Sequence, residues 1–229
     1  MANKLWTDWF DEILPEMPGC PQDYAKHHIK QSAIEFCSLT KAWRVDQEPI
    51  SSSVGVHTYE FEIPDKTDIT QILQLWYDGT QITPKSADEL GKIYKNWNIE
   101  AGTPIYYLQE TPDTFRLVPI PDTAKASAIT AKLAIQPSRD ATGLDAAIFQ
   151  NWFHEIAAGA KARLYASPKK PYTDLKLADY YRQMFMQDCG SASFDASRGM
   201  TRAPISTAIR DSYRGLGELP VKRITTTIP

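Results

Sequence analysis

The sequence predicts an α+β fold, because the spacing of its apolar residues changes twice along the chain. Apolar residues recur at steps of three and four in residues 1–48 and again in residues 141–198, as on one face of a helix. In residues 49–140 short stretches of apolar and polar residues alternate, as in half-buried strands. We therefore expect two helical regions flanking a β-rich module, followed by a C-terminal segment, residues 199–229, that has neither period.

Two helices are expected in the first region. One spans residues 5–14 and is stopped by Pro15, because proline cannot donate a backbone hydrogen bond and clashes with the preceding turn. The second should begin at Pro21 or Gln22 and continue to Arg44, where basic residues suit the end of a helix dipole. Its predicted apolar face consists of Ile29, Ala33, Phe36, Thr40 and Trp43.

The middle region is expected to form short strands and one short helix. Residues 86–97 have the spacing of the helix, and Asp78-Gly79 is a strong hairpin turn. The segments expected to be strands are 57–63, 69–77, 104–108, 114–119 and 128–135. Short strands separated by regular turn signals favour a small β-sandwich or a twisted antiparallel sheet.

The third region returns to helical spacing. Leu144, Ile148, Trp152 and Ile156 are four residues apart, and the small residues 157–160 would let another backbone approach closely. After a tight break, a last helix is expected from Thr173, with apolar positions at Leu177, Tyr180, Tyr181, Met184 and Phe185. A link this short predicts that the two helices pack as an antiparallel hairpin.

The C-terminal segment differs in charge from the rest of the chain. Beyond Gly199 five basic residues outnumber two acidic ones, so this segment has a net charge of +3. The whole chain has a net charge of −3, so residues 1–199 have a net charge of −6. A basic, irregular segment on an acidic body is typical of an arm that orders against a partner, and a frayed terminus is the alternative. The residues expected to bind that partner are Arg202, Ile205, Ile209, Arg210, Tyr213, Arg214, Leu216, Leu219, Lys222 and Arg223.

Composition argues against several classes of protein. A net charge of −3 lacks the basic excess of a nucleic-acid coat or an anionic-membrane binder. Three widely spaced cysteines without a C-x-x-C pair make a disulfide framework improbable. The N-terminus lacks the apolar core of a signal peptide, and no apolar run approaches the ~20 residues of a membrane span.

No converging set of catalytic residues is recognisable, so we expect no enzyme, no cofactor and no metal. His27 and His28 are adjacent, so on a helix their side chains diverge and cannot chelate one ion. Phosphate-binding glycine loops and a G-x-S-x-G elbow are absent from the sequence. The neighbouring carboxylates Asp11-Glu12 and Asp88-Glu89 are expected to be solvated. A hydrolase whose carboxylates come from distant parts of the chain remains an alternative.

Seven short segments follow one another along the chain up to about residue 190, among them Trp76-x-Asp78-Gly79-x-x-Ile82-x-Pro84 and several Pro-rich turns. The segments are 13–21, 35–44, 61–64, 76–84, 116–121, 156–164 and 168–171. Taken in this order, the set resembles tail adaptor (head-to-tail connector) proteins of short-tailed and related bacteriophages.

The resemblance implies a helical bundle made from both ends of the chain, with an inserted antiparallel β module and an extended C-terminal arm. It implies a structural virion protein, made in the host cytoplasm, that forms an adaptor ring at the head-to-tail interface. Such a ring, usually of twelve copies, would join the capsid portal protein to tail nozzle or fibre proteins, and the partner of the C-terminal residues given above would be the portal or a neighbouring subunit. DNA would pass through its channel during genome ejection without sequence-specific binding. A phage cell-wall hydrolase and a tail-completion or capsid-decorating protein are the alternatives.

Overall fold

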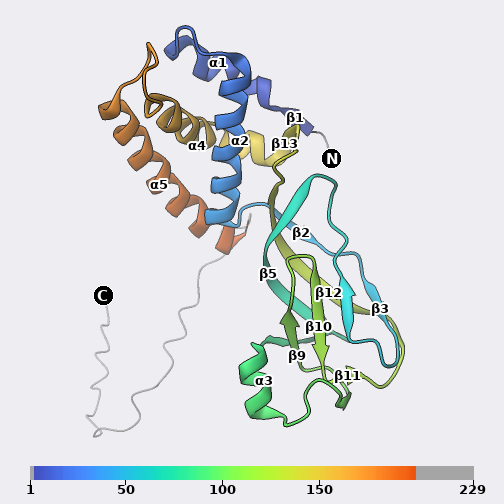
Figure 1. The fold of residues 1–229 in the computed structure, drawn as a ribbon. Coiled ribbons are helices and arrows are strands. Elements are labelled where there is room, and N and C mark those ends of the chain that lie inside the picture. Colours follow the sequence, from blue (N-terminus) through green and yellow to red (C-terminus); the bar gives the residue numbers. More distant parts are fainter. Residues whose placement is uncertain (1–2, 200–229) are drawn as a thin grey trace, which may run out of the picture.

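The computed structural model describes residues 3–199 and confirms the α+β class. Figure 1 shows a helical part, which contains both ends of the described chain, above a β part to which the short helix α3 belongs. The helical elements are η1 (Trp6–Trp9), α1 (Phe10–Ile13), η2 (Leu14–Glu16), α2 (Gln22–Thr40), α3 (Ala87–Ile93), α4 (Ala146–Tyr165) and α5 (Leu175–Arg198).

Thirteen strands form four sheets within the described residues. The two larger sheets have the orders β4-β10-β9-β7 and β2-β12-β5-β6, and β3 also pairs with β12. The strands are β1 (Asn3–Leu5), β2 (Arg44–Asp46), β3 (Ile50–Ser52), β4 (Thr58–Glu60), β5 (Thr67–Tyr77), β6 (Thr80–Gln81), β7 (Thr83–Pro84), β8 (Ala101–Gly102), β9 (Tyr106–Gln109), β10 (Thr114–Val118), β11 (Ile120–Pro121), β12 (Lys125–Pro137) and β13 (Gly143–Asp145).

The expected single helix over residues 5–14 is wrong. Leu5 instead lies in β1, where it pairs with Gly143 of β13, so helical turns begin only at Trp6. The following residues form three short turns, η1, α1 and η2, rather than one regular helix. Backbone pairing with a strand about 140 residues away therefore decides where this helical stretch begins.

Helix α2 begins at Gln22, as expected, but ends four residues earlier than the predicted Arg44. Lys41 has φ +54°, a left-handed conformation, and its backbone N–H donates to the carbonyl of Cys37. This conformation ends a helix, because the next residue can no longer continue the ladder of i to i−4 bonds. Trp43 lies outside the helix, and Arg44 starts β2 instead of the last helical turn.

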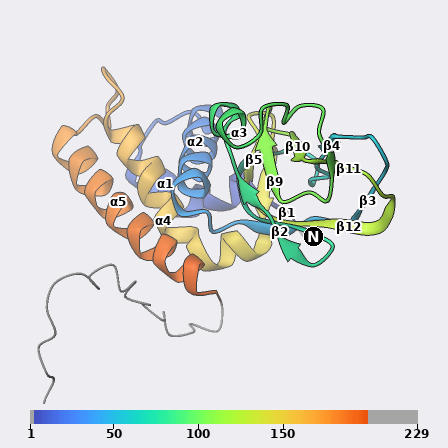
Figure 2. The same cartoon turned by 90° about the horizontal axis from the view of Figure 1, so that it is seen from below.

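Helices α4 and α5 are present and pack against each other as an antiparallel pair (Figures 1 and 2). Helix α4 begins at Ala146 rather than near Leu144, because Leu144 belongs to β13 and Asp145 caps the helix by accepting from the N–H of Ala147. Near the turn between the helices, the rings of Tyr165 and Tyr181 stack at 5.7 Å.

The β part confirms the expected hairpin and strand pair. Asp78 and Gly79 both have positive φ, 50° and 75°, which is the backbone of a type I′ turn joining β5 to β6. β9 and β10 pair antiparallel as predicted. Helix α3 ends at Ile93, short of the expected residue 97, and Ser86 caps its start with a reciprocal bond to Glu89. β4 is shorter and β12 longer than the strands predicted there.

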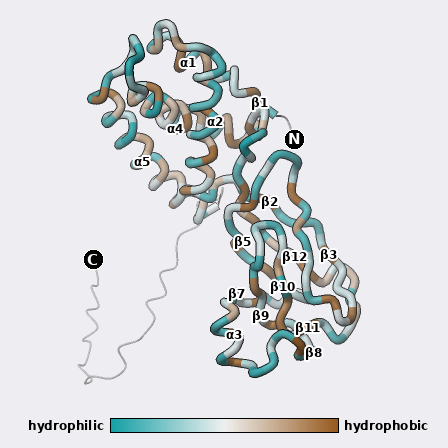
Figure 3. The backbone as a smooth tube through the Cα atoms, viewed as in Figure 1, coloured by the Kyte–Doolittle hydropathy of each residue, from teal (hydrophilic) through white to brown (hydrophobic). Residues whose placement is uncertain are grey.

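One apolar core runs through both parts. Buried residues of the helices and of both larger sheets belong to a single cluster, and α2 packs against β12 where the parts meet. Figure 3 shows brown, apolar stretches along β9, β10 and β12. Among the described residues no helix is both long and apolar enough to cross a bilayer.

Candidate functional site

The ten residues predicted to bind a partner, from Arg202 to Lys222 and Arg223, lie outside the described residues, so that assignment stays a prediction. The described chain ends at Gly199, directly after α5. In Figure 1 this end of α5 is at the lower side of the helical part, next to the β part. The surfaces closest to this end of the described chain are therefore those of α5 and of the junction between the two parts.

Helix α5 lies at the outer edge of the helical part in both Figure 1 and Figure 2. Its buried side faces α4 and α2, while Tyr180, Met186 and Phe194 on its other side are 60%, 44% and 52% exposed. We call this exposed side the α5 outer face. Apart from Arg182, its exposed residues from Tyr180 to Phe194 are uncharged, namely Tyr180, Gln183, Met186, Gln187, Gly190, Ser191 and Phe194. At its C-terminal end the guanidinium of Arg198 lies 5.3 Å from the centre of the Phe194 ring.

Several large apolar side chains exposed along one helix make this side of α5 a candidate interaction surface. The sequence had placed Tyr180 and Leu177 with the buried Phe185, but Leu177 is 39% exposed. Apolar residues surround more than half of α5, so periodicity alone could not separate its core side from its outer side.

Two glycines show the difference between the inner and outer sides of the helical pair. A Cβ on Gly159 of α4 would lie 2.2 Å from Ser32 Oγ and 2.7 Å from the ring of Phe185. This confirms that the small segment 157–160 lets other helices approach closely. A Cβ on Gly190 of α5 would meet no atom of the described residues within 4 Å.

A first ionic cluster connects the N-terminal turns to the C-terminal hairpin. Lys161 of α4, only 6% exposed at its side chain, donates to Glu16 at 2.6 Å and to Glu12 at 3.1 Å. The hydroxyls of Tyr165 and Tyr181 donate to the other oxygen of Glu16 at 3.0 and 3.1 Å. Burial opposes ionisation of Glu16, but these hydrogen bonds and the Lys161 charge outweigh it and lower its pKa.

A second ionic cluster joins α2, α4 and α5. Glu35 of α2 accepts from Arg163 of α4 at 2.6 Å and from Arg182 of α5, whose nearest contact is 2.8 Å. Burial again opposes ionisation, and the two guanidinium groups more than offset it, so the pKa of Glu35 is lowered. The only sequence signal for either cluster was a lysine and an arginine inside the small apolar run of residues 156–164.

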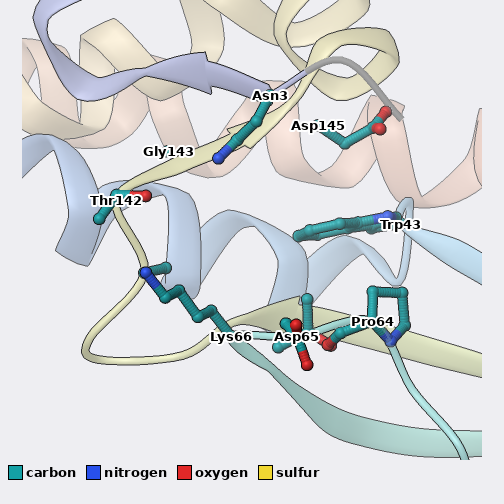
Figure 4. Close-up of a pocket in the computed structure, with 10 residues that line it drawn as sticks. Asn3, Trp43, Pro64, Asp65, Lys66, Thr142, Gly143 and Asp145 are labelled. Atoms are coloured by element: carbon teal, nitrogen blue, oxygen red, sulfur yellow. The ribbon is translucent and has the colours of Figure 1, made fainter.

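A groove of about 540 Å³ lies where the helical part meets the β part (Figure 4). Trp43 lies between the loop at Pro64 on one side and the strand residues Asn3 and Gly143 on the other. The lining residues are Asn3, Trp43, Pro64, Asp65, Lys66, Thr67, Ala141, Thr142, Gly143 and Asp145. The groove contains no cysteine, histidine or paired nucleophile and base that would support covalent or acid–base chemistry.

One histidine and two cysteines of α2 and α5 have packing roles. His28 lies edge-on to Tyr24 at 4.5 Å, and burial, reinforced by the charges of His27 and Arg163, lowers its pKa to about 4. Burial raises the pKa of Cys37 and of Cys189 to about 12, which leaves both thiols protonated and unreactive.

The neighbouring carboxylates are solvated as expected, except that Glu12 pairs with the buried Lys161, 149 residues away in the sequence. Glu89 is exposed and completes the cap of α3. Within residues 3–199 no group of three or more histidine, cysteine, aspartate or glutamate residues is arranged to hold a metal ion.

Comparison with known proteins gives one family. The model described as SU10 adaptor protein matches residues 10–208, from α1 to beyond the end of α5. The search of curated proteins gave no match.

Proposed function

Because the chain belongs to the SU10 adaptor protein family and is a structural adaptor of a bacteriophage virion, we propose that it forms a ring joining the capsid portal to the tail. DNA would pass through the centre of this ring without sequence-specific binding, and the ring would need no cofactor. The observation that supports this best is a helical part in which ion pairs connect the N-terminal turns to the C-terminal helices, with one long helix whose exposed residues between Gln183 and Phe194 are uncharged. A closed ring needs such a side surface, because each copy must contact the next through two different faces.

The C-terminal segment is proposed to bind the portal protein. Its +3 charge is opposed to the −6 of the remaining chain, so it is suited to an acidic surface outside its own body. Its apolar residues would add contact area once the segment is ordered against that surface. The ten residues from Arg202 to Arg223 named above are the proposed contacts.

The far end of the β part is proposed to face the tail nozzle or fibre proteins. In Figure 1 this end, with α3 and β11, is farthest from the helical part. Val54 and Ile99 there are 61% and 69% exposed, and the N–H of Gly55 donates to Pro121 of β11. Exposed apolar side chains gathered at one end of a module are typical of a contact surface.

Mixing the purified chain with portal rings tests the proposal. Mass measurement and imaging should show about twelve copies added as one extension at the narrow end of the portal. Binding along the capsid shell would instead identify a decorating protein, and degradation of cell-wall material by the purified chain would identify a hydrolase. Either result would overturn the proposed ring.

A second experiment tests the C-terminal contacts in the full-length chain. Replacing Arg202, Arg210, Arg214, Lys222 and Arg223 by glutamine should leave folding unchanged and weaken portal binding by 10-fold or more at low salt. The same replacement at Lys92 and Lys169, which are exposed in the described body, should leave binding unchanged. Equal binding by both variants would remove the C-terminal segment from the portal contact.

A further inference from the structure

Strand β5 has one edge that is open along most of its length. On one side β5 pairs with β12 from Thr67 to Tyr77, but on the other side it pairs with β6 only at Trp76 and Tyr77. Within the described chain, residues 67–74 therefore have no neighbouring strand on that side, and we call them the open edge. Resting on the proposed ring, we propose that residues 221–228 of a neighbouring copy add a strand to this open edge.

An edge of this length is a site for strand addition. The outer strand of a sheet presents unpaired N–H and C=O groups, and an extended segment can bind them through its own backbone. The other strands of four or more residues, β9, β10 and β12, each lie between two neighbours in the described sheets. Asp68, Gln71 and Gln74 of β5 are exposed, so the strand is also open to solvent on one face.

Two bulges decide what kind of segment can pair with the open edge. The register of β5 against β12 shifts twice, so that Thr70 and Leu73 have no counterpart on β12. Bulges bend a strand and disfavour its pairing with another rigid edge, such as β5 of a second copy. A single added segment, unlike a second folded sheet, can adopt the same bend. The bent edge therefore favours a segment from outside the folded body.

Residues 221–228 have the composition of a strand. Their sequence is Val-Lys-Arg-Ile-Thr-Thr-Thr-Ile, in which six of eight residues are β-branched, and a proline stands directly before and after it. Residues 200–220 contain only four β-branched residues in 21, so the strand signal is confined to this stretch. β-branched side chains favour extended backbone, and proline is tolerated at the ends of a strand. The stretch has eight residues, as many as the open edge.

The charges of the two segments are complementary. β5 contains Asp68 and no basic residue, whereas residues 221–228 contain Lys222 and Arg223 and no acidic residue. Strand addition uses the backbone, and adjacent side chains of a strand point to opposite faces of the sheet. One of the two basic side chains can therefore lie near Asp68 while the other remains available to the portal.

The length of the link favours β5 of a neighbouring copy over β5 of the same chain. In Figure 1, β5 forms the side of the β part nearest to the end of α5, so a short link would reach it within one copy. The link instead has 21 residues, 200–220, and can span about 70 Å when extended. Loops of this length are uncommon within one compact domain. A strand passed from each copy to the next also suits a ring, because donor and acceptor are two different surfaces.

Crosslinking on portal rings tests which copy supplies the strand. Two full-length variants are made in a Cys20→Ser background, one with Gln71→Cys and one with Thr226→Cys, and are mixed before assembly; Cys37 and Cys189 are buried. A short thiol crosslinker should give covalent dimers containing one of each variant. Glu48→Cys mixed with Thr226→Cys should give none, because the exposed Glu48 follows β2 at the opposite edge of the same sheet.

Proline substitutions test whether the backbone makes the contact. Adjacent N–H groups of a strand point to opposite sides, so one of Ile224→Pro and Thr225→Pro removes an N–H that faces β5. That variant, combined with Thr226→Cys, should lower the yield of mixed dimers by about 10-fold or more. Ile224→Ala and Thr225→Ala retain every N–H and should give the yield of the unsubstituted strand. Circular dichroism checks that each free variant folds like the natural chain.

The possible outcomes separate the added strand from the ring. Rings that assemble normally but give no mixed dimers, or equal yields from the proline and alanine variants, would overturn the inference and leave the proposed ring intact. A chain with both Gln71→Cys and Thr226→Cys that crosslinks only to itself would place the strand on its own β5 and would also overturn the inference. Failure of the natural chain to assemble on portals would overturn both.

Discussion

The helical part and the β part place their charged groups differently. In the helical part, Lys161 is almost fully buried and reaches Glu16, 145 residues away in the sequence. In the β part the ion pairs are more open to solvent, as between Lys132 and Asp46, whose side chains are 41% and 80% exposed, and the most buried cation among them, Arg116, is 15% exposed. The ion pair with the most buried charge therefore lies where the N-terminal turns meet the C-terminal hairpin, whereas the pairs of the β part lie closer to solvent.

This difference shows what stabilises each part. The β part relies on the long pairing of β5 with β12 and on packed rings, among which Phe61 and Phe115 stack at 4.5 Å. The helical part must hold N-terminal turns against a C-terminal hairpin, and buried ion pairs fix which segments meet. We expect apolar truncation to be most damaging in the β part, and charge removal to matter mainly in the helical part.

The largest expected effect is for Phe115→Ala in the β part. Phe115 is fully buried and contacts the rings of both Phe61 and Tyr59, so truncation leaves a cavity and should lower the free energy of unfolding by about 4 kcal/mol. Urea denaturation would measure it. Phe194→Ala is the matched control, because that ring is 52% exposed and its loss should cost less than about 0.5 kcal/mol in the free chain. Similar losses at both positions would contradict the assignment of Phe115 to the core.

Gly159→Ala should be the most damaging small change in the helical part. The added Cβ would overlap Ser32 Oγ, which donates to the carbonyl of Ile156, and the buried ring of Phe185. Overpacking of this kind should lower the free energy of unfolding by about 3 kcal/mol. At Gly190, the same substitution should raise it by up to about 1 kcal/mol, because alanine is the better helix former. Opposite signs in the two urea curves are the expected result, and matching signs would show that helical packing does not require Gly159.

Local patterns in the sequence were enough to predict much of the fold. Apolar spacing predicted α2 and α5, Asp78-Gly79 predicted a turn that needs positive φ, and the small residues around Gly159 predicted close helix packing. Each of these features depends on residues within one or two turns of each other. The family resemblance then supplied the arrangement of the two ends in one bundle.

Features that depend on distant partners could not be predicted. Nothing near Leu5 indicates that its backbone pairs with Gly143, and lysine at position 41 is no signal for a left-handed helix end. The two ionic clusters could not be predicted for the same reason, because Glu35 contacts Arg163 and Arg182 only in the folded chain. For the candidate surface, the sequence identified the apolar residues of α5 but not which of them face outward.

Lys161→Met tests whether charge matters mainly in the helical part. Methionine keeps the length of the side chain but leaves Glu16 and Glu12 without their cation. Loss of one member of a fully buried pair costs about 3–5 kcal/mol, and partial exposure of both glutamates should reduce this to about 2 kcal/mol. Lys132→Met removes an exposed pair of the β part and should cost less than about 0.5 kcal/mol. If urea denaturation gave equal losses of unfolding free energy for Lys161→Met and Lys132→Met, the proposed difference between the two parts would be wrong.

The smallest expected effect is a pH dependence that originates at His28 in the helical part. Because burial lowers the pKa of His28 from 6.5 to about 4, the unfolded chain takes up a proton at a higher pH than the folded chain. The free energy of unfolding should therefore fall as the pH drops from 6.5 to 4. Below pH 4 His28 should contribute no further change. A pKa shift of this size corresponds to about 3 kcal/mol, and screening by solvent around the partly exposed residue should reduce the loss to about 1 kcal/mol. Urea denaturation at several pH values measures this loss. His28→Phe should remove it, whereas Tyr24→Phe, which keeps the imidazole, should retain it. If the stability of both variants changed equally with pH, the acid sensitivity would lie at another group.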